Sequence, residues 1–150
     1  MTPPPRTAEQ RKQDTLDRLA ADVDCWVATA ENGTAYLVPL SYSWDGSTLL
    51  LATPLSNPTG RNLQASGRVR LSVGPTRDVV MVDGRVETLS PAEVPAAQAD
   101  LFAERTGFDP RALKGRWGYF VVTPDAVQAW REANELAGRD VMVDGEWLVP

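Results

Sequence analysis

The residues best suited to binding chemistry lie in one polar stretch, 53–62, which separates two apolar runs. Residues 59–65 look like a short helix, and a helix start favours an anion such as phosphate through its free N–H groups and its dipole. The Arg61 guanidinium could add a two-pronged, charge-assisted contact. We therefore predict an anion site whose candidate residues are Thr53, Ser56, Thr59, Arg61 and Asn62. An ordinary helix cap beside a solvated arginine is the alternative interpretation.

Three tryptophans, Trp117, Trp130 and Trp147, form the second candidate group. A tryptophan buries a large area, so packing in the core or at a subunit interface is the first interpretation. Trp130 or Trp147 could instead stack on a flat heteroaromatic ring across a dimer interface. The segment between these two residues is rich in charged side chains. We therefore expect it to serve an interface and not to seal the core of its own subunit.

Several kinds of catalytic site are excluded by composition. The chain has no histidine, which removes His-based triads, His metal ligands and imidazole acid–base chemistry. Its single cysteine, Cys25, cannot form an intrachain disulfide or a Cys-rich zinc site, and we expect it to be buried and inert. Glu132 and Glu135 could share a helix face, which we expect to be solvated. Any catalysis must then come from other side chains or from a cofactor.

The totals predict an ordinary globular protein. The 150 residues fit one domain, and 43% of them are hydrophobic. A net charge of −5 argues against nucleic acid as a partner, because such binding depends on basic patches. No apolar run approaches the roughly 20 residues that cross a bilayer, and the N-terminus lacks the apolar segment of a secretion signal. We expect no membrane association and a cytoplasmic location.

The N-terminal part divides into a lead-in and a helix. Residues 1–7 contain three consecutive prolines and are expected to be disordered or extended, which leaves 8–150 as a single domain. Thr7 and Gln10 have capping-box spacing, and apolar residues then recur at helical intervals. The pattern predicts an amphipathic helix over 8–21.

Alternating apolar runs after residue 24 predict an antiparallel meander. Strands 25–30, 35–44 and 48–53 are joined at Asn32-Gly33 and Asp45-Gly46, which are strong hairpin signals. Pro39 interrupts the second strand. Because proline lacks the ladder donor, it indicates a strand edge, a bulge or a backbone turned toward something other than a strand.

The remainder predicts three more barrel strands, a helix and a tail. Strands are expected at 69–74, 79–89 and 117–123, with a glycine bulge at Asp83-Gly84. After the last of these, Pro124 permits either a short helical turn or an extended segment through Trp130. A capping box at Ser90–Glu93 predicts a helix from there to about Arg105, irregular at Pro95. Residues 140–149 look like a terminal hairpin. Together these elements predict a mostly β fold, a six-stranded antiparallel barrel with a few helices.

The order of these segments resembles the pyridoxamine 5′-phosphate oxidase-like split β-barrel superfamily, and within it the flavin/deazaflavin-dependent oxidoreductases. The resemblance covers nearly the whole chain, residues 8–148. It is carried by four segments: WVATAENGTAYLVPLSYSWDG, LLLAT with TGRNLQASGRVRLSVG, DVVMVDGRVE, and TPDAVQAWREANELAGRDVMVDGEWL.

The resemblance implies a homodimer of FMN-binding-type split barrels with a cofactor, FMN or a deazaflavin (coenzyme F-420), in each of two clefts between subunits. Position by position, it implies the following cofactor contacts. The phosphate end would meet Thr53, Thr59 and Arg61, the ring would lie along Pro39, Leu40, Ser41, Val79 and Val80, and the partner would supply Trp130 through Trp147. The implied activity is hydride transfer to a small organic substrate. The alternatives are a non-catalytic flavin-binding carrier or sensor, and a scaffold that has lost its cofactor.

The chain departs from the oxidases proper at three positions. They carry a basic residue at each end of the segment that matches 37–42 and a glutamine near position 79, where this chain has Leu37, Tyr42 and Val79. Their substrate-binding stretch, rich in Arg and His, has no counterpart here. Oxidation of vitamin B6 is therefore not expected. The acidic tail of a deazaflavin would need basic neighbours, for which Arg61, Arg68, Arg70 and Arg77 are candidates.

Overall fold

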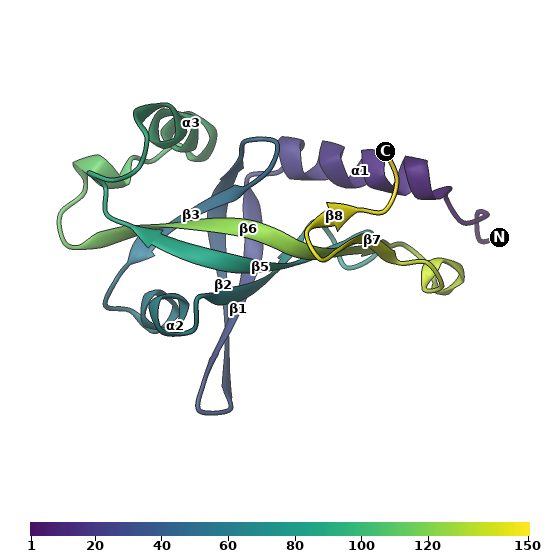
Figure 1. The fold of residues 1–150 in the computed structure, drawn as a ribbon, viewed down its shortest axis with the longest axis horizontal. Helices are drawn as coiled ribbons and strands as arrows, with labels where there is room; N and C mark the ends of the chain where they lie inside the picture. Colours follow the sequence, from purple (N-terminus) through teal and green to yellow (C-terminus); the bar gives the residue numbers. More distant parts are fainter.

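The computed structural model describes all 150 residues. The helices are α1 (Ala8–Ala21), α2 (Pro58–Ser66) and α3 (Ala96–Thr106), with short 3-10 turns η1 (Pro110–Ala112) and η2 (Ala133–Glu135). The strands are β1 (Asp24–Glu31), β2 (Thr34–Trp44), β3 (Leu49–Pro54), β4 (Arg68–Val73), β5 (Val79–Leu89), β6 (Trp117–Trp130), β7 (Asp140–Val143) and β8 (Glu146–Trp147). The helices cover the outside of the sheet (Figure 1).

Six strands form the closed antiparallel barrel that the sequence predicts. They pair in the order β3-β2-β1-β4-β5-β6, and pairing of β3 with β6 closes the ring. β7 and β8 extend the sheet beyond β6 as a terminal hairpin. No helix is both long and apolar enough to cross a membrane.

The barrel is split between β2 and β3. These strands pair only over Tyr42–Trp44 and Leu49–Leu51, after which β3 continues along β6 alone. The first part of β2, from Thr34 to Ser41, therefore pairs with β1 on one side and has a free edge on the other. In Figure 1 the β1–β2 hairpin projects away from the body of the molecule.

Two apolar cores stabilise this arrangement. The larger one fills the barrel and includes Val27, Leu51, Leu71 and Phe120. The smaller one lies under α3, where Phe102 packs edge-on against Tyr119 with ring centroids 5.8 Å apart. The alternating buried and exposed residues of β1 and β4 follow from strand geometry, because successive side chains point to opposite faces.

Most predicted elements are confirmed. Thr7 caps α1, with its Oγ1 accepting from the Gln10 N–H at 3.1 Å. Both predicted hairpin turns join the first three strands. β5 runs unbroken through Asp83 and Gly84 as predicted, and its pairing with β6 shifts register there, but the extra residue of this bulge is Asp125 on β6 and not a residue of β5.

Two boundary predictions are wrong. The helix predicted from Ser90 begins only at Ala96, because Pro95 precedes it and the residues before Pro95 form a separate turn. The Glu93 carboxylate still accepts from the Ser90 N–H at 2.8 Å, so the capping contact exists without the helix. The sixth strand does not end at residue 123: of the two alternatives left open after Pro124, the extended one is found, and the strand continues to Trp130.

Candidate functional site

The start of α2, where we predicted an anion site, is capped by its own chain. The Asn57 side chain accepts from the Gly60 N–H at 2.7 Å, and its Nδ2 donates to Thr53 Oγ1 at 2.8 Å. Pro58 has no N–H to offer. The Thr59 N–H is thus the amide of this first turn that stays without a partner, so the helix start offers less to an anion than the spacing suggests.

Gly60 lets this helix start lie directly on the end of β3. A Cβ at position 60 would lie 2.2 Å from the Pro54 carbonyl oxygen. Because that oxygen belongs to the backbone, it cannot move aside as a flexible side chain would. The close contact fixes α2, and Arg61 with it, beside the end of β3.

The five predicted anion-site residues come together around α2, but only two of them face outward. Thr53, Thr59 and Asn62 are buried, and the Asn62 Nδ2 donates to Thr29 Oγ1 on β1 at 3.1 Å. The Arg61 guanidinium donates to the Ser56 carbonyl at 2.5 Å. Arg61 and Ser56 line an open depression of about 540 Å³ together with Leu55, Gln64 and Arg116.

Arg116 was not among the sequence candidates. It reaches the depression because the β3–β6 ladder places it opposite Leu55, whose N–H donates to the Arg116 carbonyl at 2.9 Å. No local sequence signal marks this pairing. The other arginines proposed for this place lie elsewhere: Arg70 pairs with Asp83, Arg77 pairs with Glu132, and Arg68 lines a different depression.

The free edge of β2 carries the predicted ring contacts. The Tyr42 N–H donates to the Val23 carbonyl at 2.8 Å on the β1 side. Because backbone groups alternate along a strand, the backbone of Ser41, Pro39 and Leu37 then faces the free edge. Pro39 thus lacks a donor where no ladder partner needs one, which confirms the strand-edge interpretation.

A second depression, of about 600 Å³, lies over this part of the sheet. Its lining includes Pro39, Leu40 and Ser41 together with Trp26 and Ser72. Leu40 also packs against the main core, so its apolar side chain points inward. The depression is therefore formed largely by residues of β1 and β2.

The outer face of these strands is apolar and uncovered. Trp26 lies opposite Pro39 in the ladder, and Ala28 lies opposite Leu37. The Trp26 residue is 49% exposed and Leu37 is 62% exposed. Large apolar side chains gathered on one open face are typical of an interaction surface.

The remaining predicted ring contacts separate into different places. Val79 and Trp130 are direct ladder partners at the adjoining ends of β5 and β6, and both are partly exposed. Val80 is buried in the main core. Trp147 packs against that core from outside, and the Lys12 ammonium lies 5.4 Å from its ring centroid.

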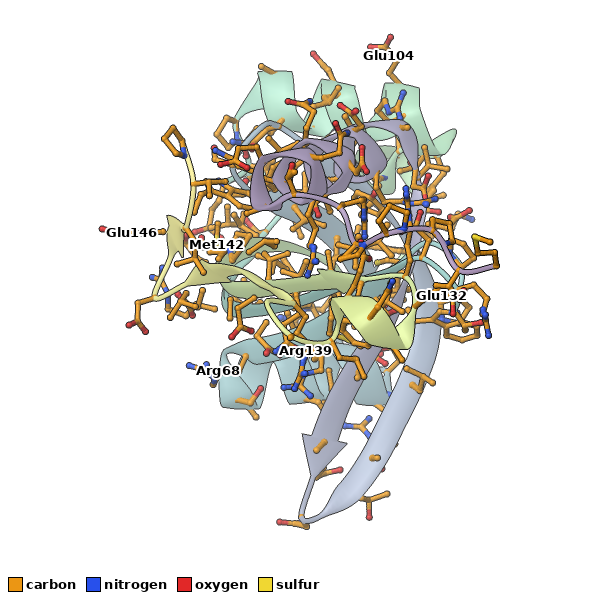
Figure 2. The ribbon with its side chains drawn as sticks, turned by 90° about the vertical axis from the view of Figure 1, so that its right-hand side faces the viewer. Arg68, Glu104, Glu132, Arg139, Met142 and Glu146 are labelled. Carbon is orange, nitrogen blue, oxygen red and sulfur yellow. The ribbon has the colours of Figure 1, made fainter.

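The C-terminal tail is held by its own subunit, contrary to our expectation from its charge. Arg11 is 4% exposed, and its guanidinium donates to the carbonyls of Ala129, Glu135 and Gly138. Val141 and Met142 of the tail are buried in the main core. Figure 2 shows the tail in yellow in front of the barrel, with Glu132 and Arg139 on it.

Glu135 is buried, so the prediction of a solvated Glu132–Glu135 face is wrong for this residue. Its side chain is 3% exposed and accepts from both the backbone N–H and the guanidinium of Arg6. The hydrogen bond from the Arg6 guanidinium lowers the pKa of Glu135 to about 2, against the opposing effect of burial. Glu132 pairs at the surface with Arg77. The lead-in before α1 is thus tied to the tail through Arg6.

Two further residues, Cys25 and Tyr42, are buried and unsuited to act as a nucleophile or as an acid or base. Burial raises the pKa of the Cys25 thiol to about 12, which leaves no thiolate at neutral pH and confirms that this cysteine is buried. Tyr42 is fully buried, its hydroxyl donates to the Leu19 carbonyl at 2.9 Å, and burial raises its pKa. Tyr42 therefore fills the barrel, and its side chain offers no free polar group to a ligand.

Comparison with solved structures supports the fold. An F420 reductase superposes with a TM-score of 0.62 at 24% identity, covering 74% of this chain and 93% of the other. A FAD-binding protein from Mesorhizobium loti gives 0.61 at 23%, with 77% and 89% covered. A proposed pyridoxamine 5′-phosphate oxidase from Listeria innocua gives 0.61 at 10%, with 84% and 100% covered.

Comparison with known sequences adds the family. No protein with a curated description matches the chain. The family model for pyridoxamine 5′-phosphate oxidase matches residues 14–131, which span every barrel strand and the helices between them. With a closed six-stranded split barrel and this match over most of its length, the chain belongs to the pyridoxamine 5′-phosphate oxidase family.

Proposed function

We propose that this protein is an oxidoreductase that binds a flavin-type coenzyme, FMN or a deazaflavin, and transfers hydride to a small organic substrate. The observation that carries the proposal is the free edge of β2, where backbone groups of Pro39 and Ser41 have no strand partner. α2 contacts both β2 and β3, so the basic depression lies near the same split in the barrel.

The residues around the split suit such a coenzyme. The unpaired backbone of β2 can hydrogen-bond the polar edge of a ring, while Trp26 and Pro39 offer apolar surface to its face. The Arg61 guanidinium, held by the Ser56 carbonyl, can bind a phosphate. Thr53 and Asn62 act indirectly, since their polar atoms hold α2 in place.

The coenzyme, when bound, supplies the redox chemistry, and the protein binds it, orients it and excludes water. This division of labour fits a chain that has no histidine and whose one cysteine is buried as the thiol. The FAD-binding protein and the F420 reductase among the structural neighbours are consistent with a flavin or deazaflavin ligand. Oxidation of vitamin B6 is not proposed, because Leu37 and Tyr42 stand in place of the basic residues.

We also propose that the active form is a homodimer. The exposed apolar face of β1 and β2 needs a cover, and a second copy of the same face would supply one. Val79 and Trp130 lie partly exposed at the ends of β5 and β6, where a partner subunit could reach them.

The test is a spectrum and two titrations. We expect the purified protein to be yellow, or to bind added FMN or deazaflavin with a measurable dissociation constant. Reduction of the bound coenzyme by a nicotinamide or deazaflavin donor would support the enzyme. A complex that no donor reduces would instead support a carrier or sensor, and a protein that binds neither compound would contradict the proposal.

A further inference from the structure

The basic depression beside α2 is lined by a second arginine, whose backbone is fixed there by a hydrogen bond. Arg116 lies directly before β6, and its carbonyl accepts from the Leu55 N–H at 2.9 Å. This bond continues the β3–β6 ladder one step beyond the Pro54–Trp117 pair. Although the Arg116 side chain is exposed, the backbone of this residue is held at the rim of the depression by regular strand pairing.

The charges of this depression are unbalanced. Neither Arg61 nor Arg116 is paired with a carboxylate, and the Arg116 guanidinium donates no hydrogen bond within the chain. By contrast, Arg70, Arg77 and Arg85 each lie within 3 Å of an Asp or Glu oxygen. The lining contains no acidic residue, although the chain as a whole carries a net charge of −5.

We infer that Arg116 is a phosphate-binding residue, and that Arg61 and Arg116 bind one phosphate group between them. The inference rests on the proposed function and names a ligand group and a residue for that site. Each guanidinium offers paired N–H groups that match two oxygens of a phosphate. Arg61 comes from α2 and Arg116 from the strand that closes the barrel, so the site depends on their juxtaposition.

The phosphate could come from two sources. It could be the terminal phosphate of the coenzyme, which would make Arg116 a residue that selects FMN over riboflavin. It could also belong to a phosphorylated substrate, in which case the coenzyme would bind equally well without Arg116. Both sources share the same chemistry at the two guanidinium groups, and a comparison of ligands with and without phosphate separates them.

The experiment titrates wild type, Arg116→Ala and Lys114→Ala with FMN and with riboflavin, and follows flavin fluorescence. We expect Arg116→Ala to weaken FMN binding roughly tenfold and to leave riboflavin binding unchanged. Lys114→Ala removes the same charge two residues away, at an exposed side chain outside the depression, and should bind both ligands within about twofold of wild type. Arg116→Lys should recover only part of the loss, because it lacks the forked geometry.

A parallel arm uses inorganic phosphate against chloride at matched ionic strength, measured as competition with FMN and as a shift in melting temperature. Phosphate that protects wild type but not Arg116→Ala, without competing with FMN, would assign the site to a second phosphorylated molecule. Equal FMN affinity in wild type and Arg116→Ala, with no difference in phosphate protection, would overturn the inference. Failure of wild type to bind FMN and also the deazaflavin would contradict the proposed function, and the phosphate arm would still decide on Arg116.

Discussion

At the scale of single residues, Arg61 is the sequence candidate that the structure leaves most available to a ligand. Its guanidinium is fixed by one hydrogen bond to Ser56 and has further N–H groups open to the depression. Thr53 and Asn62, chosen on the same reasoning, use their polar atoms to hold α2 instead. A loop of polar residues therefore contains both binding and structural positions.

Replacing Arg61 with alanine should weaken coenzyme binding by about 1.5–3 kcal/mol, the usual contribution of a hydrogen bond to a charged group. Fluorescence titration with FMN or the deazaflavin measures the dissociation constant from which this change is calculated. Arg139→Ala is a suitable control, because Arg139 is exposed on the tail and donates only to the Leu136 carbonyl. An unchanged dissociation constant for Arg61→Ala would remove this residue from the site.

The free energy of unfolding should depend on pH in the acidic range because of Glu135. Its folded pKa, about 2, is lower than its ordinary value of 4.5, so ionised Glu135 stabilises the fold above pH 4.5. That contribution is lost as the pH falls from about 4.5 towards 2. Glu135→Gln should lower the free energy of unfolding by about 3 kcal/mol at pH 7, because Arg6 and Arg11 lose their buried partner.

Urea unfolding of wild type and Glu135→Gln at pH 7 and pH 3 checks this, and the difference should shrink at the lower pH. The matched control is Glu132→Gln, which breaks only the exposed pair with Arg77 and should cost less than about 1 kcal/mol. Equal effects of the two substitutions would show that the buried network does not stabilise the fold.

At the scale of elements, the position of α2 depends on Gly60. Glycine inside a helix normally costs about 1 kcal/mol relative to alanine, so an ordinary Gly→Ala change would stabilise. Here the added Cβ would meet the Pro54 carbonyl oxygen at 2.2 Å. We expect Gly60→Ala to lower the free energy of unfolding by about 2 kcal/mol, as overpacking usually does, and to weaken coenzyme binding. A stabilised variant with normal binding would contradict the close contact.

The elements that could be predicted are those whose signals are local. Turn residues at Asn32-Gly33 and Asp45-Gly46 give the first hairpins, and Thr7 gives the start of α1. Past Pro124 the sequence leaves a short helical turn and an extended segment to Trp130 both open, and the pairing of β6 with β5 decides for the extended one. Asp83 pairs with Ala126 and Gly84 with Pro124, so Asp125 is an extra residue in β6, and a proline is tolerated at such a bulge.

The parts of the candidate site that could not be predicted depend on contacts between distant segments. Arg116 meets the depression only through the β3–β6 ladder. The tail is held on its own subunit by the Arg11 and Arg6 guanidinium groups and by burial of two of its apolar side chains in the main core. Neither kind of contact can be recognised from the local amino-acid composition. The polar character of the tail therefore indicated an interface segment that leaves the core of its own subunit unsealed, whereas Val141 and Met142 are buried in that core.

At the scale of the whole molecule, the uncovered face of β1 and β2 is the feature that a single chain leaves incomplete. Replacing Trp26 with glutamate should convert the proposed dimer to monomer and weaken coenzyme binding, because a charge would be placed in an apolar interface. Size-exclusion chromatography with light scattering measures the mass. Leu113→Glu is the control, since Leu113 is a similarly exposed apolar residue on a loop outside β1 and β2. A wild-type monomer, or a Trp26→Glu variant that stays dimeric, would contradict the proposed interface.

The pairing of β6 on both sides has a consequence for synthesis of the protein. β6 adds to β5 and also joins β3, so the ring cannot close until its first part, Trp117–Val122, has been made. A nascent chain ending earlier exposes the edges of β3 and β5, which are templates for pairing with other chains. We therefore expect fragments truncated before β6 to aggregate on the ribosome or soon after release. The complete chain should fold once β6 has left the ribosome and can pair with β3 and β5.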